Sequence, residues 1–241
     1  MEEQEIKKIV REDYAKIANQ TCCCCSNKKN EEMAKEIGYN QEDLKVPGNL
    51  GLGCGNPLAF GKIKEGDIVL DLGSGAGFDC FLASKKVGKT GKVIGLDMTQ
   101  EMIKKAEENA KKFNYENVKF ILGENENIPL EDNSVDFIIS NCVINLSPNK
   151  QKVFNEAYRV LRKNGKMYVS DIVLLGELTE EQKKERQLIS GCVAGALQKE
   201  DYIKTIKNSG FKIKILQEDK DISKKQYNGI SLESIKIEAE K

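Results

Sequence analysis

Short apolar segments alternate with longer amphipathic segments through most of the chain, and this order constrains the fold more than any other feature. Strands that alternate with helices are typical of a parallel sheet with crossover helices. The sequence therefore predicts an α/β fold with a mostly parallel sheet flanked by helices. The predicted strands are Ile68–Leu72, Lys92–Asp97, Val118–Leu122, Val135–Ser140 and Lys166–Asp171, and the predicted helices are Phe78–Lys86, Thr99–Phe113 and Lys150–Arg162.

The segments outside this core predict an arm, a cap and closing strands. Apolar side chains recur at helical spacing over residues 4–19, and polar sequence with glycine and proline follows to about Asn56. The segment Leu174–Gln198 lacks strand-like alternation, so we expect a small cap after the fifth strand. The sequence after the cap predicts one helix and a closing pair of strands: Glu200–Ser209, Lys212–Leu216 and Ser231–Glu238.

The length of 241 residues suits one α/β domain with a small appendage. We expect an N-terminal helix and cysteine-rich arm over residues 1–45. The remaining residues, 46–241, are expected to form one domain that carries the cap at about 174–198.

The charge balance and the N-terminal sequence limit the classes of partner. Lys and Arg total 38, as do Asp and Glu, so no net positive charge favours nucleic acid or an anionic membrane. The N-terminus lacks the pattern of a signal peptide, and no apolar run approaches the roughly 18 residues of a membrane span. We expect a cytoplasmic protein without nucleic-acid or membrane partners. Nothing suggests an obligate assembly, so we expect a monomer.

Eight cysteines in a reducing compartment are more naturally free thiols or metal ligands than structural disulfides. Cys54, Cys142 and Cys192 stand singly beside glycine or asparagine in loop-like sequence. Cys142 follows a predicted strand at the edge where ligands bind open α/β sheets, and Cys192 lies in the predicted cap. One such cysteine is more often a small buried apolar side chain. Three together indicate a thiophilic substrate such as As(III), because soft thiolates select soft centres.

The segment Asp71–Gly77, DLGSGAG, joins a predicted strand to a predicted helix. A glycine cluster in this position can simply make a tight turn. An acidic residue, Asp97, ends the next strand about twenty residues later, where a ribose-binding carboxylate is expected. Asp71, two residues before the first glycine, would repel phosphate but attract an ammonium group. The segment therefore favours a nucleotide-like ligand that carries an ammonium group.

The stretch VLDLGSGAGFDC followed by GKVIGLDMTQEMIKKAEENA resembles the first two motifs of class I methyltransferases, which use S-adenosylmethionine. The likeness covers residues 60–172 and implies a Rossmann-like fold in which the loop glycines let the backbone approach the cofactor. It also implies that Asp97 binds the ribose hydroxyls, that Met98 packs on the adenine, and that Glu124 and Asn125 read the adenine edge. The cofactor-binding residues that we expect are Asp71, Gly73, Ser74, Gly75, Gly77, Asp97, Met98, Glu124, Asn125 and Asn141.

The three cysteine contexts GLGCGNP, SNCVINL and GCVAGAL resemble hallmark stretches of the arsenite methyltransferases, and the likeness runs from about Tyr14 to about Ser209. The resemblance implies that Cys142 and Cys192 bind As(III) and that Cys54 joins them, which makes these three the expected catalytic residues. The family also has a reactive cysteine in its N-terminal arm, proposed to form a disulfide with the counterpart of Cys54. The arm of this chain offers four adjacent candidates for this relay or disulfide partner: Cys22, Cys23, Cys24 and Cys25.

The chain contains no histidine, so the commonest general base is missing. As(III) needs no base, because its lone pair attacks the methyl group directly. Transfer leaves formally pentavalent arsenic, so we expect a thiol reductant, thioredoxin or glutathione, as co-substrate. The expected function is arsenite methylation for detoxification. Two alternatives stay open: a methyltransferase for a small organic acceptor, and a non-catalytic thiol module that sequesters As(III) or Sb(III).

Overall fold

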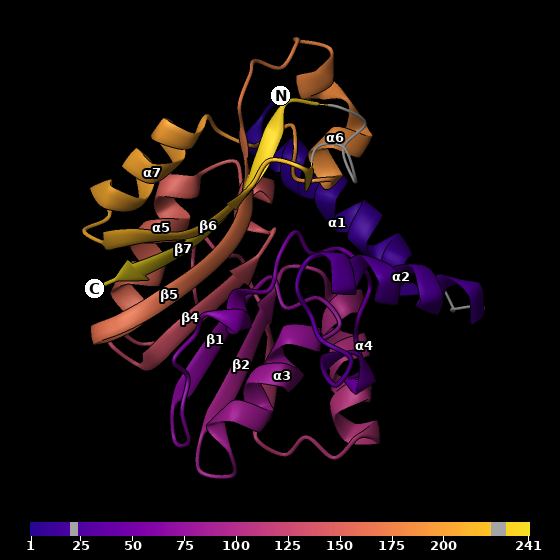
Figure 1. Cartoon of the computed structure of the whole chain (residues 1–241), viewed down its shortest axis with the longest axis vertical. Helices are drawn as coiled ribbons and strands as arrows, with labels where there is room; N and C mark the ends of the chain where they lie inside the picture. The colour runs from indigo at the N-terminus through magenta and orange to yellow at the C-terminus, as the bar shows by residue number, and fades with distance from the viewer. Residues whose placement is uncertain (20–23, 223–229) are drawn as a thin grey trace.

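The computed structural model describes residues 1–19, 24–222 and 230–241, and these residues form one seven-stranded sheet between two layers of helices (Figure 1). The strand order is β3-β2-β1-β4-β5-β7-β6. The strands are β1 (Ile68–Leu72), β2 (Lys92–Asp97), β3 (Val118–Leu122), β4 (Val135–Asn141), β5 (Leu161–Leu174), β6 (Lys212–Asp219) and β7 (Leu232–Glu240).

The pairing directions confirm the predicted fold class. Strands β3, β2, β1, β4 and β5 are parallel neighbours, whereas β7 pairs antiparallel with β5 and β6 antiparallel with β7. The parallel strands therefore end at one edge, and the closing pair extends the sheet beyond β5. The strand order reverses direction between β1 and β4, which is where ligands bind in open α/β folds.

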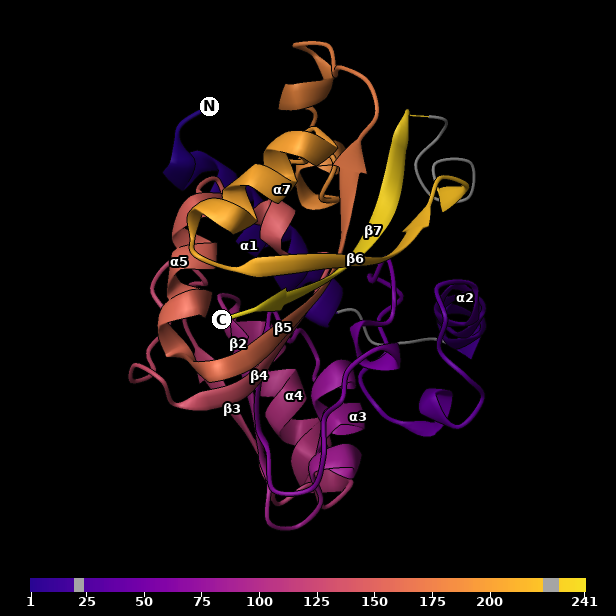
Figure 2. The ribbon, with the colours of Figure 1, turned by 60° about the vertical axis from the view of Figure 1, so that its left-hand side comes forward.

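Helices cover both faces because the parallel strands are apolar on both sides. Helices α3 (Phe78–Val87) and α4 (Gln100–Lys112) cover one face, and α5 (Lys150–Val160) and α7 (Lys199–Asn208) cover the other (Figure 2). Successive side chains of a strand point to opposite faces. Thus Val69 of β1 packs in the cluster that includes α3 and α4.

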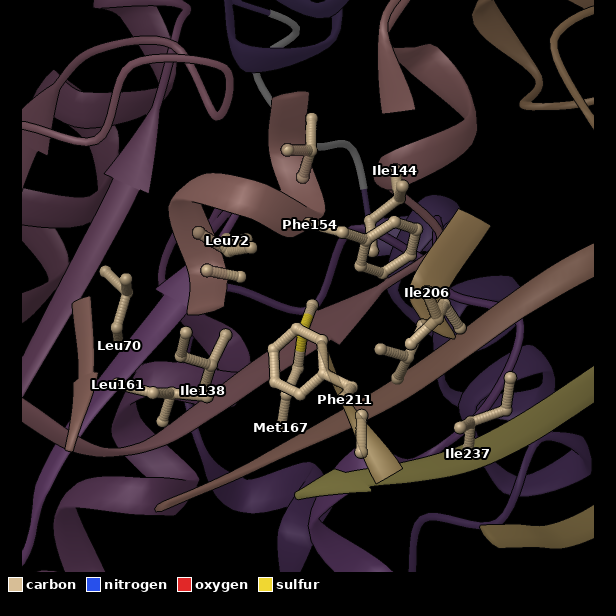
Figure 3. Packing of buried hydrophobic residues seen from close by; sticks show 14 of the residues in the cluster. Leu70, Leu72, Ile138, Ile144, Phe154, Leu161, Met167, Ile206, Phe211 and Ile237 are labelled. Atoms are coloured by element: carbon tan, nitrogen blue, oxygen red, sulfur yellow. The ribbon is translucent and has the colours of Figure 1, made fainter. Parts of the chain in front are cut away.

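The layer that includes α5 and α7 contains the larger buried cluster. Leu70 and Leu72 of β1 pack there with Phe154 of α5 and Met167 of β5 (Figure 3). All four side chains are fully buried. Burying each such side chain stabilises the fold by about 1.5–3 kcal/mol relative to leaving it in water. The pairing of Leu72 with Ser140 places the C-terminal ends of β1 and β4 beside each other.

Three predicted strands, β1, β2 and β3, have the predicted bounds, whereas β5 is longer than predicted. The prediction ended this strand at Asp171, whereas β5 continues through the apolar residues Ile172 and Val173 to Leu174. In the structure β7 pairs with β5 from Lys166 to Leu174, so a long-range ladder sets the length. The antiparallel pairing of β6 with β7 confirms the predicted closing pair of strands.

Helix α1 (Glu3–Asn19) confirms the predicted N-terminal helix, but α2 (Cys24–Glu36) lies in a segment that we expected to be irregular. The sequence of α2 is polar and has no apolar repeat of helical period. Tertiary contacts stabilise it instead: Ala34 is buried, and Asn30 and Asn49 each donate from Nδ2 to the other's carbonyl at 3.3 Å.

The predicted cap contains the turn η4 (Gln182–Lys184) and the helix α6 (Arg186–Ser190). Helix α1 lies against α6 above the C-terminal ends of the parallel strands (Figure 1). Arg186 binds both carboxylate oxygens of Asp13 at 2.7–3.0 Å and also pairs with Glu12. No helix of the described residues combines the length and apolar character that a membrane crossing requires.

Candidate active site

The loop between β1 and α3 exposes its backbone at the C-terminal edge of the sheet. Gly73, Gly75 and Gly77 have φ angles of 67°, 52° and 93°, a region that favours glycine. A β-carbon at Gly73 would lie 2.2 Å from Val143 Cγ2, whereas one at Gly75 would meet no atom within 4 Å. Gly75 therefore faces open space, as expected of backbone that a ligand approaches.

Asp97, the last residue of β2, is oriented by this loop. Its Oδ2 accepts a hydrogen bond from Gly75 N at 2.9 Å, and its Oδ1 accepts one from Thr99 N at 2.9 Å. Burial raises the pKa of this carboxyl group, and the two backbone bonds oppose the rise. The chain therefore holds a buried carboxyl group in one orientation at the wall of a cavity.

This cavity lies where the glycine loop, the strand ends and α1 meet. Its wall includes eight of the expected cofactor residues: Asp71, Gly73, Ser74, Gly75, Asp97, Met98, Asn125 and Asn141. Ser74 Oγ is buried and has no hydrogen-bond partner among the described residues. Gly77 does not line the cavity; it precedes α3 and packs against Phe81 and Phe120.

Glu124 also lies outside the cavity wall, so its expected contact with the adenine edge stays a prediction. Its carboxylate accepts from Lys7 Nζ and Arg11 Nη2 of α1, each at 2.7 Å. These hydrogen bonds lower the pKa of Glu124, the bond from Lys7 contributing most. The neighbouring Glu126, with Asn125, lines the cavity instead. The local sequence could not separate these positions, because the contact with α1 crosses more than a hundred residues.

Two buried carboxyl groups, Asp71 and Asp79, line the same cavity. Burial raises the pKa of Asp79 to about 6. Burial, and after it repulsion from Asp79, holds the pKa of Asp71 well above its usual range. A cation in the cavity would offset the charge of this pair. The arrangement fits the ammonium group expected at Asp71 and adds Asp79, which the sequence reasoning missed although it begins the helix after the glycine loop.

Asn141, at the end of β4, connects this cavity to Cys54. Its Oδ1 accepts from Cys54 N at 3.1 Å, and its Nδ2 lies 2.9 Å from the Tyr39 hydroxyl and 3.1 Å from Asp79 Oδ2. The Tyr39 hydroxyl donates to Asp79 Oδ1 at 2.6 Å. One amide therefore ties the loop of Cys54 to a carboxyl group of the cavity wall.

Cys142 and Cys192 hold backbone conformations that residues with a β-carbon rarely adopt. Their φ angles are 56° and 66°, and the other described non-glycine residues with positive φ are all asparagines. Asparagine tolerates this region, whereas cysteine has no such preference. Strain of this kind persists where the surrounding structure imposes it, and it concentrates at functional sites.

The structure brings Cys54 and Cys142 together with a carboxyl group. The two sulfur atoms and one oxygen of Asp171 all lie within 4.8 Å of one another. Cys192 is outside this group, but its Sγ donates to the carbonyl oxygen of Cys142 at 2.6 Å. Cys142 lines the cofactor cavity, so it is the thiol that both others adjoin and that faces the expected cofactor. The sequence reasoning missed Asp171.

The pKa values of the Cys54 and Cys192 thiols are raised. Burial is the main cause that raises the pKa of Cys54, with a contribution from its contact with Cys142. For Cys192 the contact with Cys142 is the larger cause and burial the second. A thiophilic ion binds the deprotonated form, so binding must release protons. Lys150 is buried nearby, and burial lowers its pKa to about 8.

An apolar cluster surrounds the thiols and excludes water from them. It contains the three cysteines with Val10 of α1 and Ile189 of α6. Of the four arm cysteines, Cys22 and Cys23 lie outside the described residues, and Cys24 and Cys25 begin α2. The expected relay or disulfide partner among Cys22–Cys25 therefore stays a prediction.

Comparison with known proteins agrees with this geometry. A family model described as a methyltransferase domain matches residues 63–210. The arsenite methyltransferase of Halobacterium salinarum is 48% identical over 181 residues, which are 74% of this chain and 46% of that protein. The arsenite methyltransferase of Aquipseudomonas alcaligenes is 40% identical over 178 residues, 71% of this chain and 51% of that protein. This chain thus spans about half the length of these curated relatives.

The fold comparison gives the same family. A crystal structure of an arsenic(III) S-adenosylmethionine methyltransferase from Chlamydomonas reinhardtii superposes with a TM-score of 0.69 at 34% identity. The match covers 87% of this chain and 73% of that one. The chain therefore belongs to the arsenite methyltransferase family of the class I S-adenosylmethionine-dependent methyltransferases.

Proposed function

We propose that this protein transfers a methyl group from S-adenosylmethionine to trivalent arsenic. One observation carries the proposal. Cys142 lines the cavity formed by the expected cofactor residues, and its sulfur lies within 4.8 Å of the Cys54 sulfur. The Cys192 thiol donates a hydrogen bond to the carbonyl oxygen of Cys142. Thiols that adjoin one another beside a methyl donor's cavity suit an acceptor that thiolates bind.

The cofactor half of the site is supported by its donor set. Asp71 and Asp79 suit the ammonium group of S-adenosylmethionine, Asp97 suits the ribose hydroxyls, and Gly75 leaves room for close approach. Met98 is partly buried and lines the same cavity, which suits packing against the adenine. When bound, S-adenosylmethionine supplies an electrophilic methyl group on a sulfonium ion.

The arsenic half of the site works through thiolate coordination. We assign Cys142 as the shared ligand, with Cys54 and Cys192 as its partners on either side. Soft thiolates bind As(III) and donate electron density to it, and the apolar cluster around them excludes water. Holding arsenic at Cys142 points its lone pair at the cavity of the methyl donor, and this alignment lowers the barrier by positioning alone.

The reaction leaves arsenic formally pentavalent, so a reductant must return it to the trivalent state before a further transfer. We propose a thiol reductant of the thioredoxin or glutathione class, with one arm cysteine of Cys22–Cys25 as relay to Cys54. We also propose that the protein acts as a monomer and that methylation serves arsenic detoxification in the cytoplasm.

The test is to incubate the purified chain with arsenite, labelled S-adenosylmethionine and a thiol reductant, and then to separate the arsenic species. We expect labelled methylarsenicals. Cys142→Ser should abolish the product and leave the dissociation constant for S-adenosylmethionine unchanged. Cys80→Ser is the matched control for the loss of a buried thiol, because Cys80 is equally buried but lies outside the thiol group. Because Cys80 donates to Asp71 at 3.2 Å, the dissociation constant of this variant for S-adenosylmethionine is measured beside its rate.

Each other outcome points to a different function. Stoichiometric arsenic binding without transfer would indicate a sequestering thiol module. Transfer only to an organic acceptor would mean that the thiols are incidental. Product from Cys142→Ser at the wild-type rate would refute the assigned arsenic site.

A further inference from the structure

The loop of Cys54 runs between two cavities. Gly53 lines the cofactor cavity, whereas Cys54 lines a second cavity, which neither Cys142 nor Cys192 lines. The second cavity encloses about 720 Å³, part of it open to solvent. The end of α2, the segment after Cys54 and strands β6 and β7 bound it, and its wall includes Glu36, Phe60, Gln217, Asp219, Ser234 and Lys236.

Hydrogen bonds tie the backbone of Cys54 to the walls of both cavities. Its N–H donates at 3.1 Å to Oδ1 of Asn141, which lines the cofactor cavity. Its carbonyl oxygen accepts at 2.9 Å from Oγ of Ser234, which lines the second cavity. The Cys54 sulfur also lies within 4.8 Å of the Cys142 sulfur. An ion that binds Cys54 can therefore pass to Cys142 without crossing solvent.

Lys236 of β7 places an ammonium group in the wall of the second cavity. Its Nζ donates to Gln217 Oε1 at 3.0 Å and lies 5.4 Å from the centroid of the Phe60 ring. A β-carbon at Gly55 would lie 3.0 Å from Lys236 Cε, so the glycine after Cys54 leaves room for the lysine stem. Asp219 acts on the ammonium group electrostatically, but no carboxylate of the described residues forms an ion pair with it.

The Lys236 side chain is partly buried and still carries its charge at neutral pH. Burial lowers its pKa, and the charges of Cys54 and Asp219 oppose the fall. Lys150 is more deeply buried and keeps a pKa of about 8. A partly buried cation without an ion-pair partner favours a ligand that brings a negative charge.

Two acidic side chains of the same wall limit what this ligand can be. Glu36 is exposed at the end of α2, and Asp219 is partly buried at the end of β6. They would repel a simple anion such as phosphate and attract a cation. A ligand with both a carboxylate and an ammonium group matches the whole set. The charges of the second cavity therefore suit an amino-acid group.

The position beside Cys54 adds a requirement for thiol chemistry. As(III) binds thiols strongly, so in a compartment that contains small thiols it travels as a thiol complex. Amino-acid thiols such as glutathione carry the carboxylate and ammonium groups that the second cavity matches. Bound S-adenosylmethionine would occupy the cofactor cavity, and the second cavity leaves a separate approach to Cys54.

We propose that the second cavity binds the amino-acid group of a small thiol that carries As(III), with the carboxylate at Lys236, and so delivers the arsenic to Cys54. The proposal rests on the proposed function and deepens it. Lys236 binds the carrier thiol and does not touch the reacting atoms, so it is a positioning residue.

The delivery step is an exchange of thiols on arsenic. The bond from arsenic to the small thiol breaks, a bond from arsenic to the Cys54 sulfur forms, and the proton of Cys54 passes to the departing thiol. Arsenic stays trivalent, so the step needs no oxidant or reductant. Two further exchanges, with Cys142 and Cys192, complete the set of three cysteine ligands and release the remaining small thiols.

The test measures the loading of arsenic onto the full chain without S-adenosylmethionine. The protein is mixed with the tris-glutathione complex of As(III) or with arsenite alone, and the arsenic-bound fraction is followed over time by mass spectrometry. We expect Lys236→Gln to slow loading from the complex by roughly tenfold, as for loss of a hydrogen bond to a charged group. Loading from arsenite alone should keep its rate, because arsenite has no carboxylate.

Two matched variants separate the charge of Lys236 from its bulk and from the net charge of the protein. Lys236→Arg keeps a cation in the wall and should load from the complex nearly as fast as wild type does. Lys214→Gln removes an exposed lysine of β6 that does not line the second cavity, and it should change neither rate.

A competitor tests the second cavity without any substitution. S-methylglutathione keeps the charged groups of glutathione but has no free thiol, so it cannot exchange on arsenic. In wild type it should slow loading from the tris-glutathione complex and not from arsenite. In Lys236→Gln it should compete more weakly. This measurement covers the case that Lys236→Gln does not fold.

The outcomes separate this proposal from the proposed function. Equal slowing with both arsenic sources in Lys236→Gln, unchanged loading from the complex, or no competition by S-methylglutathione overturns the delivery site. If wild type loads arsenic and then fails to methylate it when S-adenosylmethionine is added, the proposed function fails. The ratio of the two loading rates still decides the role of Lys236 in that case.

Discussion

Asp97 shows how one residue can be assigned from a short sequence pattern and then understood only from its contacts. Its distance from the glycine loop along the chain suggested a ribose ligand. In the structure the loop itself orients the carboxyl group, since Gly75 N and Thr99 N each donate to one oxygen. Asp97 also lines the cavity. The orientation is built before any cofactor binds, which reduces the entropy lost on binding.

We expect Asp97→Asn to weaken S-adenosylmethionine binding by roughly tenfold to a hundredfold, because an amide nitrogen replaces one of two charged acceptors. Titration calorimetry measures the dissociation constant. Asp136→Asn is a matched control. Asp136 Oδ2 also accepts a hydrogen bond from a backbone N–H, that of Ile68 at 2.8 Å, but it lies at the N-terminal ends of β1 and β4, away from the cavity. Equal affinities in wild type and Asp97→Asn would remove Asp97 from the cofactor site.

At the scale of elements, α1 closes the site from above. It contributes Lys7, Val10 and Tyr14 to the cavity wall, and Lys7 pairs with Glu124 and Glu126 at 2.7 and 3.1 Å. The Tyr14 hydroxyl contributes a long bond of 3.4 Å to a carbonyl of α6. The ion pairs of the buried Lys7 gain little net stability, because their charges must be removed from water, so the buried Val10 should contribute most to the docking of α1.

Val10→Ala should therefore loosen α1 without unfolding the sheet. Removing two buried methyl groups costs roughly 1.5–3 kcal/mol, and here the cost falls on the docking of one helix. We expect faster amide hydrogen exchange in α1 and α6 and weaker cofactor binding. Lys8→Ala, on the exposed side of the same helix, is the control. Unchanged exchange in α6 would show that α1 does not support the cap.

At the scale of the whole molecule, the buried carboxyl groups of the cavity make folding depend on pH and on ligand. The pKa of Asp79 is raised to about 6 by burial, above its value in the unfolded chain. Between about pH 4 and pH 6 the folded chain therefore holds a proton that the unfolded chain releases. The free energy of unfolding must then fall as pH rises through this range.

We expect this contribution to be on the order of 3 kcal/mol for a shift of about two units. Asp79→Asn should remove it, so the difference in melting temperature between variant and wild type should grow in favour of the variant from pH 4 to pH 7. Saturating S-adenosylmethionine should reduce the difference, because its ammonium group offsets the carboxylate. Parallel stability curves for the two proteins would contradict the burial of a titrating Asp79.

The sequence could predict what depends on neighbours along the chain. The bounds of β1, β2 and β3, the glycine loop and the three isolated cysteines all follow from patterns a few residues long. Side-chain period and the turn chemistry of glycine are local physical constraints, so they are readable without the fold. The same holds for the resemblance to arsenite methyltransferases, which depends on three short contexts.

The tertiary structure alone decided which of these residues meet. In the structure Glu124 forms an ion pair with α1, and tertiary contacts stabilise the polar helix α2. The ladder with β7 extends β5 beyond its predicted end. It placed Asp171 beside Cys54 and Cys142, and left Cys192 at the carbonyl of Cys142. Contacts of this kind depend on packing between segments far apart in the chain. No pattern a few residues long encodes the distances between such segments. The sequence by itself therefore determined which reactive side chains this site contains, and the tertiary structure decided which of them lie in contact.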